Sequence, residues 1–402
     1  MSRFASILHT QESLVPVEVE LDTNQGAQAA SEAVVDIQND SAIVDNFDGG
    51  LNAAETAIAN IDELSSNLQE MQDNGGITEF AEKTAQVALE SIMSSLGLTH
   101  EIPTTESLSK TNIIATLEEK SESLISRAIA GAKAAFEAVI NFIQGLLRNR
   151  GALVKYLEGL RQKLASIKDE SEIDLTKESR YYSNPTQAVG AINTAEKCIT
   201  FAEGVGFYLK EIEKAVAAGE TSVDTEVSER KKWGNHSPDQ RFEYIEDFVQ
   251  KEATKTFGVQ EGPVGIVAGA KSLSIGKKND RLRFSVHDAD KGEKAQPDLS
   301  DLSEIINKAL AAANQLKKLD KVDSALKVFL RNVITGIQRN LNRFQNRNIM
   351  DDHKRYAAMN QRFSMIGLQY ARVAAREYGT QLPSIAFKNL KAAGDYVKQY
   401  IG

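Results

Sequence analysis

The segment 322–376 constrains the fold of this chain most strongly. Apolar residues recur there at intervals of three or four over two stretches, namely Leu326, Leu330, Val333, Ile337, Leu341 and Phe344, and then Tyr356, Met359, Phe363, Ile366, Tyr370 and Val373. This spacing places each set on one side of an α-helix. A polar run at 348–353 separates the sets and contains aspartates that can cap a new helix. The segment therefore predicts two antiparallel helices.

The same segment is basic on the sides that point away from these stripes. It holds ten basic residues against three acidic ones. Eight of the ten are arginines that we expect on the outer faces: Arg331, Arg339, Arg343, Arg347, Arg355, Arg362, Arg372 and Arg376. A charged run is usually no more than the solvated face of a helix. The alternative is a cationic surface that binds a partner.

The rest of the 402-residue chain has mostly helical periodicity. The region 257–297 differs, because it is rich in glycine and its alternating runs at 272–275 and 281–286 predict an inserted β-hairpin. The segment 25–50 has no sustained period and is expected to be mostly unstructured. The predicted fold class is mainly α, an elongated helical bundle with a small β-hairpin insertion and an acidic N-terminal helical segment.

Charge divides the chain into two parts. Residues 1–106 contain two basic residues, Arg3 and Lys83, against 19 acidic ones, which gives a net charge of −17. Because the whole chain carries −9, residues 107–402 carry +8. We therefore predict an acidic N-terminal segment followed by a helical body that contains the β insertion and the basic helical hairpin.

No recognisable catalytic, cofactor or metal motif occurs in the sequence. The five histidines are scattered, and neither HExxH nor a Cys/His ligand set is present. The stretch 265–272, GIVAGAKS, lacks the glycine that precedes lysine in a phosphate-binding loop. Cys198, the single cysteine, lies in a helical stripe and is interpreted as a buried structural thiol. We expect no enzyme, no cofactor and no metal site.

Two segments bear on localisation. The N-terminal sequence MSRFASILHTQESL has too short an apolar run for a secretory signal. The most apolar long stretch, 124–147, is interrupted by Arg127, Lys133 and Glu137, which would each be costly at the centre of a bilayer. We expect neither secretion nor integral membrane association.

An acidic, separable segment ahead of a basic helical body without catalytic motifs resembles the internal head proteins of giant tailed bacteriophages. The resemblance implies a non-enzymatic virion protein that is made in the host cytoplasm, packaged inside the capsid with phage DNA and with capsid or other internal head proteins, and ejected into the host. It also implies an N-terminal propeptide that a prohead protease removes by cutting after glutamate, with a small residue two positions earlier. Glutamates in this context are Glu32, Glu55, Glu90 and Glu106.

A cut requires extended and accessible backbone, which favours Glu32, Glu55 and Glu106 over Glu90, because Glu90 lies in a predicted helix. Loss of the acidic segment would change the net charge from −9 to +8. The eight arginines are then the candidate DNA-contacting face, which would bind phosphates without sequence preference. Two alternatives remain, a capsid assembly or scaffolding protein and a host-directed effector, both acting through helical protein–protein contacts.

Overall fold

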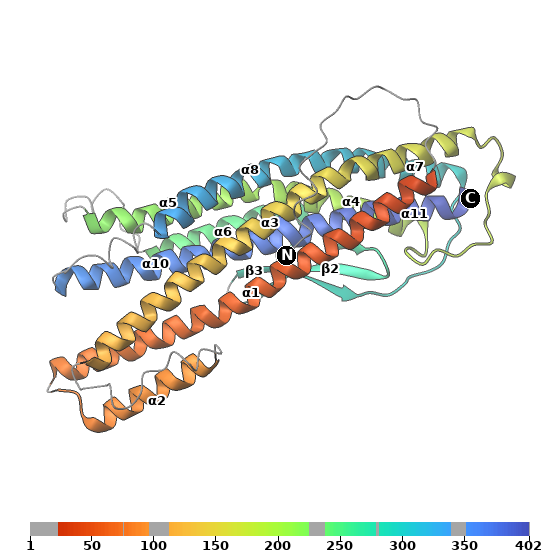
Figure 1. Cartoon of the computed structure of the whole chain (residues 1–402). Coiled ribbons are helices and arrows are strands. Elements are labelled where there is room, and N and C mark those ends of the chain that lie inside the picture. Colours follow the sequence, from red (N-terminus) through yellow and green to blue (C-terminus); the bar gives the residue numbers. More distant parts are fainter. Residues whose placement is uncertain are drawn as a thin grey trace, which may run out of the picture.

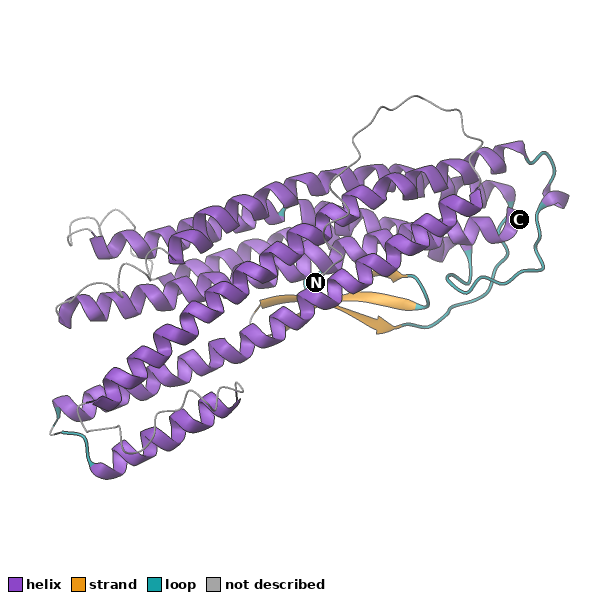
Figure 2. Cartoon of the chain, in the orientation of Figure 1, coloured by secondary structure: helices purple, strands orange, loops and turns teal. Residues whose placement is uncertain are grey.

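The computed structural model describes residues 23–74, 76–95, 112–224, 238–278, 281–338 and 351–401. Long helices run side by side and give the molecule an elongated shape (Figure 1). Figure 2 shows that the strands form one small sheet against a side of this bundle. The described residues form a mainly α fold with a small β insertion, which confirms the predicted fold class.

The first helix, α1 (Thr23–Asp73), runs antiparallel to α3 (Asn112–Ser166), and the shorter α2 (Glu79–Ser95) lies at one end of this pair (Figure 1). The expectation that 25–50 is unstructured is wrong, because α1 spans it. Its buried residues are Ala30, Ala33, Ala57, Ile58, Ile61 and Leu68. Small side chains allow the backbones of two helices to approach closely, so packing on α3 can support a helix whose own apolar pattern is weak.

Three helices follow, which are α4 (Pro185–Glu203), α5 (Val205–Asp224) and α6 (Pro238–Phe257). The start of α4 is set by its sequence, because the Asn184 side chain accepts a hydrogen bond from the Gln187 amide and a proline occupies the first helical position. Nearly half of the residues of α4 are buried, including Cys198, as the sequence predicted.

The inserted sheet contains three antiparallel strands in the order β1 (Gly262–Val267), β2 (Lys271–Lys278) and β3 (Arg281–Asp288). The predicted hairpin corresponds to β2 and β3, in which Ile275 lies opposite Phe284. Both of these side chains are buried and belong to the face that packs on the helices. The strand β1 was not predicted, because it contains two glycines and a proline, which are depleted in strands.

After the sheet, α7 (Leu299–Gln315) leads through a short 3₁₀ turn into α8 (Asp320–Phe329) and a π-helical turn, η6 (Leu330–Ile334). The start of α7 has a capping box, in which Asp298 and Asp301 each accept a hydrogen bond from the other's backbone amide. The first apolar stripe of the 322–376 segment is helical as far as residue 338, as predicted, and its last two members, Leu341 and Phe344, lie outside the described residues.

The second stripe forms α10 (Asp351–Arg376), which continues through a π-helical turn, η7 (Glu377–Gln381), into α11 (Leu382–Ile401). The two predicted helices are not packed simply against each other, because α5 packs against both α8 and α10. Pro383 does not break the helix. The π turn lies directly before it, where the regular backbone hydrogen bonding is already interrupted.

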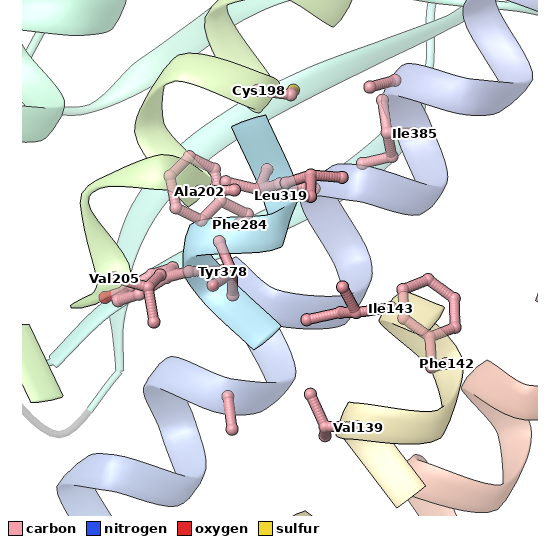
Figure 3. Close-up of a cluster of buried hydrophobic side chains, with 14 of the residues drawn as sticks. Val139, Phe142, Ile143, Cys198, Ala202, Val205, Phe284, Leu319, Tyr378 and Ile385 are labelled. Carbon is pink, nitrogen blue, oxygen red and sulfur yellow. The ribbon is translucent and has the colours of Figure 1, made fainter. Parts of the chain in front are cut away.

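The helices and the sheet share one apolar interior. Figure 3 shows its centre, where Val139 and Ile143 from α3, Ala202 from α4, Phe284 from β3 and Tyr378 from η7 come together. Tyr378 packs edge-on against Phe201 and Phe284, with ring centroids 5.1 and 6.0 Å away. The β insertion is therefore part of the core of the bundle.

Candidate functional site

The eight arginines expected on one outer face do not form a continuous surface in the described part of the chain. Arg331 is exposed in η6. Arg372 is only 6% exposed, so its predicted outward position is wrong. Arg376 is partly exposed, and its Nη1 atom lies 4.0 Å from Oε1 of Glu377. The remaining five are outside the described residues (Arg339, Arg343 and Arg347) or have side chains outside them (Arg355 and Arg362).

The burial of Arg372 follows from the position of the last turns of α10. These turns pack against α3 and α5, and most side chains between 364 and 376 are buried. A helix enclosed by neighbours on several sides has no free outer face, whatever its sequence pattern suggests.

A buried carboxylate follows directly after this part of α10. Glu377 is 4% exposed, and its two carboxylate oxygens accept hydrogen bonds from the Arg283 guanidinium at 3.1 Å and from the backbone amide of Phe284 at 3.0 Å. Burial raises the pKa of Glu377, and the bonds from Phe284 and Arg283 offset part of this rise. The basic C-terminal segment and the β insertion are therefore joined by a partly buried ion pair that neither sequence pattern indicated.

Further side chains cover the same outer edge of β3. Glu246 of α6 lies near the Leu282 amide, 3.5 Å away, and accepts a hydrogen bond from the Tyr208 hydroxyl at 3.2 Å. Gln381 donates to the Phe284 carbonyl at 3.2 Å. Burial raises the pKa of Glu246 as well. Backbone groups of an edge strand that would otherwise be free are thus bonded to helix side chains.

The opposite edge of the sheet, on β1, is closed in the same way. The Thr194 hydroxyl of α4 accepts a hydrogen bond from the Ile266 amide at 2.9 Å. Asn389 of α11, which is fully buried, accepts from the Ala268 amide at 3.0 Å and donates to the carbonyls of Ile266 and Ala191, both at 2.9 Å. Side chains from helices on both sides therefore hold the sheet in place.

The four candidate cleavage glutamates lie in different surroundings. Glu32 is exposed, and Glu55 has no described side chain, but both positions are inside α1. The expectation that these two lie in extended backbone is therefore wrong. Glu90 is half-buried in α2, as expected for a helical position. Glu106 is outside the described residues.

The described residues contain no group of three or more His, Cys, Asp or Glu side chains that could hold a metal ion. Burial raises the pKa of the Cys198 thiol, which disfavours the nucleophilic thiolate. The half-buried carboxylate of Glu246 and the buried carboxylate of Glu377 are bonded to backbone amides and to a tyrosine or arginine side chain, an arrangement that fixes structure. No described helix is long and apolar enough to span a membrane.

A family model described as phiKZ-like phage internal head proteins matches residues 32–374. No curated protein and no solved structure matches the chain. The matched range begins in α1 and ends in α10, so it includes α2 to α8 and the whole sheet.

Proposed function

Because the chain belongs to the family of phiKZ-like phage internal head proteins, we propose that it is packaged inside the capsid together with the phage DNA and is ejected with it. The family match, which extends over most of the chain, carries this proposal. It establishes a structural role in the virion and a place among the contents of the head. Association with DNA and delivery into the host go further and are proposed.

Protease protection tests the location. Protease added to intact virions should leave the chain uncut, since the capsid shields it, whereas virions ruptured by osmotic shock should lose it. A major capsid protein followed in the same samples serves as the control for capsid integrity. Digestion in intact virions would contradict a place inside the head.

Contact with DNA is expected to be sequence-indifferent, because it would rest on cationic side chains and phosphates. The net charge of +8 on residues 107–402 supports this proposal. Binding to two unrelated duplexes of equal length should be equally strong and should weaken steeply with salt. A marked preference for one duplex, or affinity that does not change with salt, would contradict it.

Removal of the acidic segment by a prohead protease is the second part of the proposal. The position of α1 on the outside of the bundle supports it, since loss of α1 would leave α4, α7 and α11 packed against one another (Figure 1). A cut after Glu32 or Glu55 would require local unfolding of α1. Mass determination of the chain recovered from virions should show a lighter species that begins directly after Glu32, Glu55, Glu90 or Glu106. A species that begins at Met1 or Ser2 would refute processing.

A further inference from the structure

The outer side of α2 carries an exposed stripe of uncharged residues. Four residues at intervals of three or four share this side of the helix, namely Phe80, Thr84, Val87 and Ser91. Phe80 is 81% exposed and Val87 is 65% exposed. The Thr84 hydroxyl donates a hydrogen bond to the Phe80 carbonyl at 2.8 Å, so the stripe can be covered without loss of a hydrogen bond from Thr84 to water.

The opposite side of α2 holds the helix on the bundle. Ala85, Leu89 and Met93 are each 1% exposed, and α1 is the main neighbour of α2 (Figure 1). A helix at the surface of a globular protein normally has one apolar side, toward the core, and a polar side toward solvent. Because α2 exposes Phe80 and Val87 on its second side, that side indicates a surface that binds another chain.

The sizes of the residues along this side fit a second copy of the same helix. Phe80 lies at one end of the stripe, and the small side chains of Ser91 and Ser94 are exposed at the other end. If two copies of α2 pair antiparallel about a two-fold axis between residues 86 and 87, Phe80 of each copy lies over Ser91 and Ser94 of the other. The two Val87 side chains then meet near the axis. Large side chains opposite small ones allow two helices to pack closely.

Charged residues beside the stripe fit the same pairing. Lys83 and Glu90 are seven positions apart and lie along one flank of the stripe. Around a two-fold axis midway between them, Lys83 of one copy faces Glu90 of the other, which gives two reciprocal ion pairs. Within one copy, Lys83 lies 2.9 Å from Glu79, with side chains 73% and 74% exposed. Surface pairs of this kind contribute little, so Lys83 is free to turn toward a second copy.

We infer that the stripe Phe80, Thr84, Val87 and Ser91 is a self-association surface, on which α2 pairs antiparallel with α2 of a second copy of the chain. One helix from each copy gives a contact at the small end of protein interfaces, below about 1,200 Å², so the dimer is weak and depends on concentration. The surface lies within the acidic segment 1–106. Removal of that segment would abolish the dimer, and this consequence alone rests on the removal proposed above.

Sedimentation equilibrium of the full-length chain in the absence of DNA tests the dimer. The unaltered chain should show a monomer–dimer equilibrium. Phe80→Ala combined with Val87→Ala should raise the dissociation constant at least about tenfold, since a change at a two-fold contact acts in both copies. The control is Tyr244→Ala combined with Val328→Ala, at exposed positions of α6 and α8, which should leave the dissociation constant unchanged. Circular dichroism establishes that every variant retains its helices.

A charge exchange tests the antiparallel arrangement. Lys83→Glu and Glu90→Lys should each weaken the dimer several-fold, whereas the chain with both changes should regain most of the affinity, because the reciprocal pairs are restored. Absence of this recovery would overturn the inference, as would a Phe80/Val87 variant that weakens the dimer no more than its control. A chain that stays monomeric up to its solubility limit would also overturn it and would leave this face to a different partner. The place of the chain in the virion is unaffected by any of these results.

Discussion

Replacement of Asn389 by alanine should destabilise the protein more than almost any other single change of a polar residue. The side chain is fully buried and makes three hydrogen bonds to backbone groups, from the Ala268 amide and to the carbonyls of Ile266 and Ala191. Alanine removes all three and leaves the Ala268 amide without this acceptor at the sheet edge. The variant thus affects α4, α11 and β1 at once.

The magnitude follows from these contacts. A buried donor or acceptor left unsatisfied costs about 1–3 kcal/mol, and the carbonyl of Ala191 can retain its bond within α4. Loss of the Ala268 and Ile266 bonds together with a small cavity gives about 3 kcal/mol of lost unfolding free energy. The control is Asn141→Ala, at an exposed position in α3, where the change should lie within about 0.5 kcal/mol.

Urea denaturation followed by circular dichroism measures the stability difference between Asn389→Ala and Asn141→Ala. Hydrogen exchange gives a local readout, since the Ala268 amide should be protected in the unaltered chain and exchange much faster in the Asn389 variant. An Asn389 variant as stable as the control, with the Ala268 amide still protected, would refute the assignment of Asn389 as the link between helix and strand.

Three further predictions concern the same sheet. Burial raises the pKa of Glu377 above its ordinary value of 4.5, so the folded state takes up a proton more readily than the unfolded state. The stability that the raised pKa provides is full below pH 4.5 and is lost as the pH rises through the pKa of the folded state. Urea titrations at several pH values should show this loss of stability in the unaltered chain but not in Glu377→Gln. Gly265→Ala should cost about 1–3 kcal/mol in the same assay, since its Cβ would collide with Thr194, while Gly276→Ala meets open space and should cost less. Thr194→Val should cost about 1–2 kcal/mol through loss of its bonds to Ile266 and Gly190, and a neutral result would contradict that role.

Local patterns predicted most of the helices correctly, because they depend on apolar spacing and on caps. The first stripe of 322–376, as far as residue 338, lies in α8, in η6 and in the helical turn that follows, and the second stripe lies in α10. The segment 25–50 was not predicted to be helical, because its buried face consists largely of alanine and its helix depends on contact with α3. Such tertiary support leaves no period in the sequence.

The contacts around the sheet could not be predicted from the sequence. Glu377 lies 94 positions from Arg283, and Asn389 lies 121 positions from Ala268. From the sequence alone, Glu377 at the end of an arginine-rich helix would be assigned to the surface, because its contact with β3 is not visible in any local pattern. The error at Arg372 has the same origin, since helical periodicity gives the face of a residue but not what covers that face.

The bonds from helix side chains to both edges of the sheet bear on aggregation through strand pairing. Where copies of the chain come into contact, an open strand edge could pair with a neighbouring chain and begin a fibrous polymer. Glu246, Glu377 and Gln381 bond to Leu282 and Phe284 on the β3 edge, and Thr194 and Asn389 bond to Ile266 and Ala268 on the β1 edge. A neighbouring strand could therefore not pair at these positions. Contact between copies of the chain at these positions would therefore not start irreversible aggregation by β-strand pairing.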